Sequence, residues 1–276
     1  MPTETLPFDP NQVPKLLKEG RIKVVRSPQV TSSERAVSTD RMTERAKDIL
    51  GKDFLGVEAV RNMEAKLKGV GQAVEFDTAA LPPIPYTEKD LELARQHGEM
   101  LVLRVGLMRL GGREVPLSLI NFRELFRTDP LNKLSTPYFA FRSDANDWYK
   151  DQPFATKGGE IGLSWALVAK NILPGSNSKT LNQQARVMET YATNLQSQGA
   201  SRTEFRRRTA TEAAYDTLLY YVNNGEQLLS DKYDWTQTRT SDGRLVLVGY
   251  FDSGGLGVDY WDPTLQYPNI GVCLSR

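Results

Sequence analysis

Residues 244–261 read RLVLVGYFDSGGLGVDYW. The two halves of this stretch are rich in branched and aromatic residues, which are enriched in β-strands. Between them lies DSGG, a run of turn-forming residues at 252–255. We therefore predict short antiparallel strands over 244–251 and 256–258, with a further strand over 270–274 near the carboxyl end.

Two amphipathic helices are predicted upstream of these strands, over 182–195 and 211–223. Gly225 follows the second helix as its C-cap, because glycine readily takes the left-handed conformation there. Thr87 is predicted to cap an earlier helix that ends near Gln96 and carries acidic residues in its first turn, where the helix dipole favours them. Two more strands are predicted, over 100–105 and within the apolar run 161–173. The fold class is therefore α+β.

The proline-rich run LPPIP at 81–85 breaks regular structure and is the best domain boundary in the sequence. We predict a small, mostly helical region over 1–83 and a larger mixed domain over 84–276. The elements expected in the first region are a helix within 54–68, a charged segment with cap-like starts over 31–50, and a short helix or strand pair over 15–26.

Charge and hydropathy argue against several classes of partner. The chain has 35 basic and 34 acidic residues, for a formal net charge of +1, so its overall field favours neither nucleic acid nor an anionic membrane surface. No run of about 18 apolar residues occurs, so no membrane insertion is expected. The amino-terminal residues lack the apolar core of a signal peptide. We expect a chain made in the cytoplasm that, if it is exported, leaves by another route such as inside a virion.

Cysteine and histidine are scarce in this chain, which has one of each, Cys273 and His97. An intrachain disulfide is impossible, and a structural zinc site, which needs roughly three or four such ligands, is nearly excluded. We expect no cofactor and no metal. Calcium is an alternative because acidic residues lie in the glycine-rich carboxyl-terminal segment, but no dense spacing of oxygen ligands supports it. Cys273, in a terminal apolar strand, is predicted to be a small buried hydrophobe.

Two short motifs match those of enzymes in letters only. Ser253 lies in the DSGG of trypsin-like proteases, but His97 lacks the sequence setting of that family's catalytic base. Ser176 begins the SxxK of penicillin-recognising enzymes, but no SDN or KTG element accompanies it. We interpret the first motif as a glycine-rich turn and the second as a loop entering a helix. Three acidic pairs are interpreted as solvated surface or turn caps: Glu58 with Glu64, Asp144 with Asp147, and Asp231 with Asp234.

Aromatic residues are concentrated in the last part of the chain, among glycine, aspartate, asparagine and serine. This mixture is typical of recognition surfaces, in which rigid rings supply contact area and small polar residues supply adaptable hydrogen bonds. Trp235 is predicted to belong to the core. Tyr260, Trp261 and Tyr267 lie in the run 259–269, which lacks strand alternation, and are predicted to face water or a ligand.

Four motifs in this part of the chain resemble a known family. RTATEAAY at 208–215 is similar to the RLPTEAEW helix start of the C-type lectin fold found in formylglycine-generating enzymes, and YDWT at 233–236 resembles that family's WEWT segment. The variant with GYFDSGG at 249–255 and GVCLSR at 271–276 resembles the variable proteins of diversity-generating retroelements. The resemblance is good over 205–276 and loose over 86–204, and the amino-terminal region has no matching motif.

The resemblance implies a rigid lectin-type scaffold that presents interchangeable side chains. In such systems an error-prone reverse transcriptase rewrites the adenines of a template that is copied into the 3′ end of the gene. The variable region here would span about 235–276, and an adenine-rich AAC codon cannot become a tryptophan codon, so Trp261 would be a fixed neighbour. The positions expected to vary and to bind ligand are Tyr250, Asp252, Gly255, Asp259, Tyr260, Asp262, Thr264, Leu265, Tyr267 and Asn269.

The expected function is that of a non-enzymatic display protein that binds a protein or glycan on a host or neighbouring cell surface. The catalytic cysteine chemistry of formylglycine-generating enzymes is not carried over, because the chain has a single cysteine. Two alternatives stay open. One is an enzyme, either formylglycine-generating-like or a hydrolase that uses Ser253, and the other is a structural virion or assembly protein whose residues 1–83 oligomerise. The residues expected to form the fixed core are Leu245, Val246, Val248, Phe251, Val258, Ile270 and Val272.

Overall fold

The structure, a computed structural model, describes residues 32–276 apart from 134–138, 140, 142–147 and 159–160. The chain divides into two compact units, Met1–Arg41 and Met42–Arg276. The helix α2 (Ser32–Leu50) begins in the first unit and ends in the second. The element expected over 15–26 and the acidic pair Asp144 and Asp147 lie outside the described residues.

The fold is mixed α+β, as predicted, and its largest sheet joins distant parts of the chain. The strand order is β1 (Phe54–Leu55), β3 (Glu99–Arg104), β6 (Ser164–Ala169), β12 (Leu274–Ser275) and β7 (Arg206–Arg207). Strands β3 and β6 run antiparallel over their whole length. These two strands confirm the strands predicted over 100–105 and within the apolar run 161–173. The carboxyl-terminal strand β12 pairs with β6 on one side and β7 on the other, so the end of the chain is built into this sheet.

A second sheet contains the strands of the segment 244–261. Its order is β10 (Gly255–Trp261), β9 (Leu245–Asp252), β8 (Tyr233–Arg239) and β11 (Ile270–Gly271). Strand β9 pairs antiparallel with both β8 and β10, which confirms the predicted hairpin. The prediction that 259–269 lacks a strand is wrong at its start, because β10 continues to Trp261 by pairing with β9. A third sheet contains β2 (Val74–Phe76), β4 (Leu107–Leu110) and β5 (Arg113–Pro116).

Local sequence signals set most helix ends. The remaining helical elements are η2 (Gly51–Asp53), α3 (Val57–Lys68), α4 (Glu88–His97), α5 (Leu119–Leu125), α6 (Pro153–Thr156), α7 (Leu181–Ser197) and α8 (Ala210–Asn224). Thr87, Thr180 and Thr209 each form a capping box at the start of α4, α7 and α8. Gly225 ends α8 with φ of +70°, as predicted. None of the described helices is both long and apolar enough to cross a membrane.

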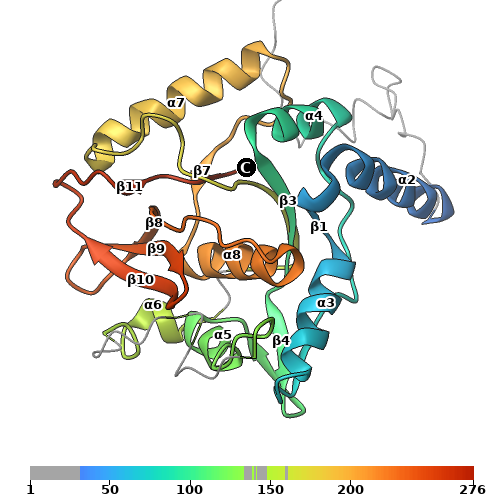
Figure 1. Cartoon of the computed structure of the whole chain (residues 1–276). Helices are drawn as coiled ribbons and strands as arrows, with labels where there is room; N and C mark the ends of the chain where they lie inside the picture. Colours follow the sequence, from blue (N-terminus) through green and yellow to red (C-terminus); the bar gives the residue numbers. More distant parts are fainter. Residues whose placement is uncertain (1–31, 134–138, 140, 142–147, 159–160) are drawn as a thin grey trace, which may run out of the picture. The chain divides into compact units, whose positions relative to one another are not determined.

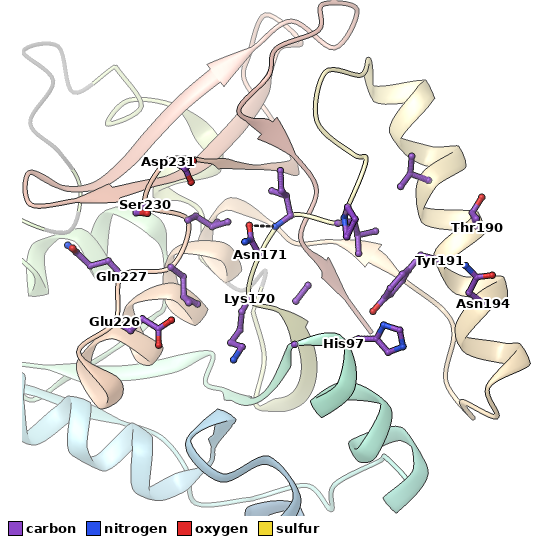
Figure 2. A pocket seen from close by; sticks show the side chains of 18 residues that line it. His97, Lys170, Asn171, Thr190, Tyr191, Asn194, Glu226, Gln227, Ser230 and Asp231 are labelled. Carbon is purple, nitrogen blue, oxygen red and sulfur yellow. Dashed lines mark hydrogen bonds between the residues drawn. The ribbon is translucent and has the colours of Figure 1, made fainter.

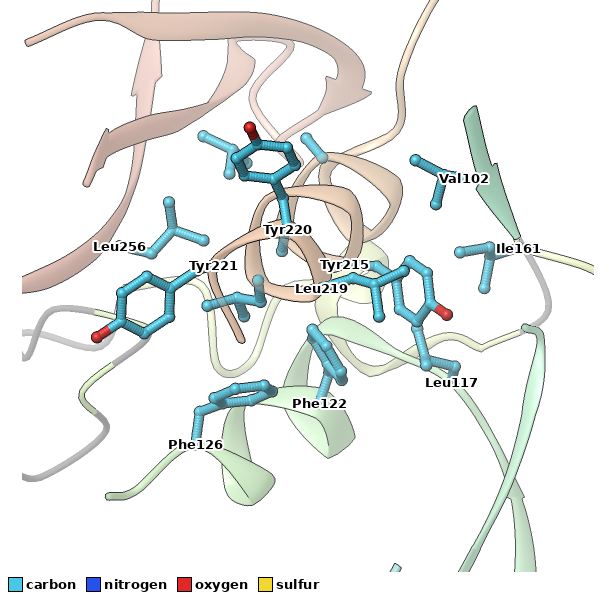
Figure 3. Close-up of a cluster of buried hydrophobic side chains, with 14 of the residues drawn as sticks. Val102, Leu117, Phe122, Phe126, Ile161, Tyr215, Leu219, Tyr220, Tyr221 and Leu256 are labelled. Atoms are coloured by element: carbon cyan, nitrogen blue, oxygen red, sulfur yellow. The ribbon is translucent and has the colours of Figure 1, made fainter. Parts of the chain in front are cut away.

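Helix α8 is the centre of the core. Every residue from Ala210 to Val222 is buried, so the prediction of an amphipathic helix with a solvated face is wrong. The helix contacts β3, α3 and α5 as well as β8 and β9, and Figure 3 shows Tyr215, Tyr220 and Tyr221 radiating from it in different directions. The Tyr215 hydroxyl donates a 3.0 Å hydrogen bond to the carbonyl of Leu103. A helix that is buried all round must pair each of its polar groups internally.

Residues on both sides of the proline-rich run share this core. Leu55, Met63 and Val74 pack in the same apolar cluster as Met100 and Tyr215. The run itself lies against the large sheet, since the indole of Trp165 donates a 2.9 Å hydrogen bond to the carbonyl of Pro82. The boundary expected at 83–84 therefore falls inside the unit Met42–Arg276.

A buried ionic network joins α8 to the large sheet. Arg104 of β3 binds both carboxylate oxygens of Asp216 at 3.0 and 2.7 Å, and it donates a further 2.7 Å hydrogen bond to Glu212. Arg208 contacts the same Asp216 carboxylate at 3.3 Å. All four side chains are at most 4% exposed. Removing one member would leave an uncompensated buried charge, which is costly.

We expect Asp216→Ala to lower the free energy of unfolding by about 3–5 kcal/mol, because Arg104 loses its bidentate partner inside the core. Urea denaturation measures the change. Asp231→Ala, which removes an exposed partner of Lys232, is the matched control and should lower stability far less, because water screens an exposed ion pair. If the first variant does not fold, Asp216→Asn keeps the shape and should still lose more stability than the control. Equal losses in the two positions would contradict the role of the network.

Asp90 holds the carboxyl end of the chain and the start of α4. Burial opposes its ionisation, but hydrogen bonds from Ser201 and Thr87 outweigh this and lower the pKa of Asp90 to about 2. Arg276 lies 3.5 Å from the Asp90 carboxylate and 2.8 Å from that of Glu99. The ionised form of Asp90 is therefore the one that stabilises the folded chain.

This lowered pKa predicts a pH dependence of stability. The contribution of Asp90, about 2 kcal/mol, is fully present above the unfolded pKa of about 3.9 and is lost as the pH falls through about 2. Denaturation of the wild type and of Asp90→Asn between these pH values should therefore show a smaller difference at the acid end. The exposed Asp48→Asn is the control. A wild-type-to-Asp90→Asn difference that is constant with pH would contradict the assignment.

Candidate functional site

A small pocket opens at the face of the second sheet, and it collects side chains from all four strands of that sheet and from the loop before β11. Its volume is about 260 Å³. Leu247 and Ile270 supply its apolar part and belong to the same cluster as the fully buried Trp235. The side chains that line it are Tyr233, Leu247, Tyr250, Asp259, Trp261, Tyr267, Asn269 and Ile270. Of the pockets in the described part of the chain, this one contains the residues expected from the sequence.

Strand alternation decides which residues of β10 reach the pocket. Asp259 and Trp261 both line it, as residues two apart in a strand share a face. Tyr260 points the other way. Its ring packs edge-on against Trp148 at 4.7 Å between centroids, and the guanidinium of Arg244 lies 3.5 Å from its centre. The expectation that Tyr260 faces water or a ligand is met in part, since the side chain is half-buried.

Two pairs of aromatic rings form the walls. Trp261 and Tyr267 lie 4.9 Å apart between centroids with their planes inclined at 55°. Tyr233 and Tyr250 are stacked at 5.5 Å with an angle of 26°. Tyr267 is 43% exposed, so this ring is accessible from solvent. The pocket therefore presents aromatic surface on more than one side.

Backbone contacts fix the wall formed by Tyr233 and Tyr250. Gly249 has φ of +155°, and a Cβ added there would lie 2.3 Å from the carbonyl oxygen of Lys232. This close approach lets the amide of Tyr250 donate a 2.7 Å hydrogen bond to the same carbonyl. The amide of Tyr233 donates to the carbonyl of Asn269 at 2.8 Å, which ties the end of the loop to β8.

The remaining expected positions do not line the pocket. Asp262 organises the loop between β10 and β11, because its carboxylate accepts hydrogen bonds from the amide and the hydroxyl of Thr264 at 2.8 and 2.6 Å. These bonds lower the pKa of Asp262. Leu265 is 53% exposed at the tip of this loop. Asp252 is the last residue of β9, and its carboxylate accepts a 2.8 Å hydrogen bond from the amide of Gly254 in the following turn.

Gly255 does not fit the expectation that it varies. It is buried with φ of +104°, and an added Cβ would lie 1.4 Å from the carbonyl oxygen of Phe139. Both the backbone conformation and the space available therefore require glycine. Gly255 was predicted to vary because of its position in the sequence, next to the turn residues Ser253 and Gly254. Those neighbours are exposed, but Gly255 itself is buried.

We expect Gly255→Ala to destabilise the chain by at least about 2 kcal/mol, since the methyl group clashes with backbone and the conformation is strained. Ser253→Ala, in the exposed part of the same turn, should change stability by less than about 0.5 kcal/mol. Thermal and urea denaturation of the two variants measure the contrast. If the Gly255→Ala protein is as stable as the wild type, glycine is not required here and Gly255 stays among the positions expected to vary.

Three lining residues were not singled out as site residues from the sequence. Leu247 and Ile270 were expected in strands, and Ile270 in the core, which is correct, since both are buried beneath the site. Tyr233 was counted among the aromatic residues of the last part of the chain and lies in the family-like YDWT motif, but it was not predicted to be a site residue. Its position in the aromatic-rich segment was the signal available, but only the pairing of β8 with β9 brings it opposite Gly249 and beside Tyr250.

A larger cleft of about 910 Å³ lies elsewhere, between α7, the segment 169–174 and the loop after α8. Figure 2 shows Ser230 and Asp231 on one wall and Tyr191 on the opposite one. Two polar groups of this cleft are already engaged: the Tyr191 hydroxyl contacts Glu99 at 3.2 Å, and Lys170 binds Asp53 at 2.7 Å. We favour the smaller pocket as the candidate site, because residue chemistry and not volume distinguishes it.

The residues with enzyme-like motifs are separated in the fold. Ser253 is exposed in the β9–β10 turn, whereas His97 ends α4, with its Nε2 3.3 Å from the Gln198 side chain. Cys273 is fully buried, as predicted, and burial raises the pKa of its thiol, so it stays protonated at neutral pH. Within the described ranges, no group of three or more histidine, cysteine or acidic residues is placed to hold a metal ion.

Comparisons with protein-family models, with curated proteins and with solved structures find no match. The α+β class therefore rests on the structure itself. Function has to be argued from the chemistry of the pocket and from the motifs in the sequence.

Proposed function

We propose that this chain is a ligand-binding protein and not an enzyme, with a C-type-lectin-like framework whose carboxyl-terminal surface is diversified by a retroelement. Its partner would be a protein or glycan on a host or neighbouring cell surface. Aromatic anchors such as Trp261 and Tyr267 would supply most of the binding energy, as a few central residues do at most interfaces.

The observation that carries the proposal is the separation of exposed from buried positions within 245–272. Nine of the ten positions expected to vary are exposed or half-buried, and Gly255 is the exception. Exposed substitutions usually change stability by less than about 0.5 kcal/mol, so such positions can be replaced at little cost. The residues expected to form the fixed framework are all at most 5% exposed: Leu245, Val246, Val248, Phe251, Val258, Ile270 and Val272.

A single carboxylate supports the lectin-type framework by linking three of the family-like motifs. Asp234, in YDWT, binds the guanidinium of Arg208, the first residue of RTATEAAY, at 2.8 Å. The other oxygen of Asp234 accepts a 2.8 Å hydrogen bond from the amide of Cys273, in GVCLSR. In such a domain, the antiparallel strands β8–β10 and the helices α7 and α8 would take the places of the expected strands and two helices.

The gene itself provides the sharpest test. In related isolates, we expect amino-acid substitutions to concentrate at the nine exposed or half-buried positions, because these lie in the region that the retroelement would rewrite and are not part of the buried framework. A near-identical template and a reverse transcriptase gene should lie nearby. Sequencing the locus measures both.

The exposed face of α7 is the internal control, since its residues are equally free of packing constraints but lie outside the expected region. Substitutions spread evenly over α7 and the carboxyl-terminal surface would contradict diversification. Replacement of Gly255 in functional copies would contradict the conclusion that this buried position requires glycine.

A further inference from the structure

We propose that the pocket beside β10 binds a cationic head group, an ammonium or guanidinium carried by the partner. This inference rests on the proposed ligand-binding function and specifies the chemistry that the pocket recognises. In a protein partner, the head group would be the end of a lysine or arginine side chain.

Aromatic faces are the first reason. Tyr233, Tyr250, Trp261 and Tyr267 all line this one pocket. The face of an aromatic ring is electrostatically negative and attracts a cation placed within about 6 Å of its centre, most strongly for tryptophan. Because the rings of Trp261 and Tyr267 are inclined at 55°, they can contact a rounded group from two sides.

The charge of the pocket is the second reason. Asp259 is the charged residue among the lining side chains, and no lysine or arginine lines the pocket in the part of the chain that the structure describes. The carboxylate of Asp259 is exposed and accepts a 2.8 Å hydrogen bond from the amide of Tyr260. Among the described residues it has no ion-pair partner. It is therefore available to a cation from outside.

Basic residues nearby in the sequence are occupied elsewhere. Arg244 binds Asp242 at 2.6 Å and stacks on Tyr260, on the face of β10 away from the pocket. Lys232 binds Asp231 at 2.8 Å. Neither residue is therefore an ion-pair partner of Asp259.

Size is the third reason. A volume of about 260 Å³ is below the range of roughly 300–1,000 Å³ typical of pockets for drug-sized ligands. It suits the end of one side chain. Asn269, at the end of the loop, adds an amide that can accept a hydrogen bond from an N–H donor.

The test uses the full chain and three probes: choline, methylguanidinium, and 3,3-dimethyl-1-butanol, the neutral isostere of choline. Binding is followed by the indole N–H resonance of Trp261 during each titration. We expect at least one cation to bind at least tenfold more tightly than the neutral isostere. Asp259→Asn should weaken cation binding about fivefold or more and leave the weak binding of the isostere unchanged.

Trp261→Leu should also lose the cation preference, followed in this variant by line broadening of the probe. Glu189→Gln removes the same charge from the exposed face of α7 and should leave every affinity unchanged. Melting temperatures of all variants show whether each is folded.

Equal affinity for choline and its isostere, or no binding of either cation, would overturn the inference. So would an Asp259→Asn variant, folded as judged by its melting temperature, that binds cations as well as the wild type. None of these results bears on the proposed function, which is judged by the pattern of substitutions at the locus. Conversely, if the pocket prefers cations but the gene shows no diversification among isolates, this inference stands and the proposed function is contradicted.

Discussion

The fully buried carboxylate of Asp234 is the contact on which the carboxyl-terminal half of the protein depends. One oxygen binds Arg208 at the start of α8, and the other accepts the amide of Cys273 just before β12. Burial raises the pKa of Asp234, while the positive charge of Arg208 opposes that shift. Strand β8, the central helix and the end of the chain are thereby held by one side chain. If that carboxylate were absent, a guanidinium would remain in the core without its partner.

Arg208 extends the same interaction into the centre of the molecule, since it also contacts Asp216, which Arg104 of β3 holds from the large sheet. The charged residues of this network are buried, and α8 is also packed by apolar and aromatic side chains (Figure 3). The strength of ionic contacts rises as water is excluded, and an interior with every charge paired has few alternative arrangements. The two sheets and the central helix in Figure 1 are consequently fixed relative to this network within the unit Met42–Arg276.

The candidate site depends on that framework but contributes little to it. Beneath the pocket, Trp235, Leu247 and Ile270 are buried, whereas Tyr267 and Asp259 at its rim are exposed. Rim side chains can therefore change while the sheet below keeps its register. Gly255 shows where that freedom stops: two residues beyond exposed Ser253, the chain passes so close to Phe139 that no side chain fits.

Features that depend on neighbours along the chain could be predicted from the amino-acid sequence. Thr87 and Gly225 set helix ends through local hydrogen bonds and backbone conformation, and the branched residues of β9 made a strand the favoured local structure. Features that depend on residues far away in the chain became visible only in the folded protein. Pairing with β9 extended β10 to Trp261, ionic partners from other elements buried the polar side chains of α8, and the β8–β9 register placed Tyr233 beside Tyr250. The physical reason is that capping and turn formation need only the adjacent residues, whereas strand register and charge burial are settled by which distant groups the whole chain brings into contact.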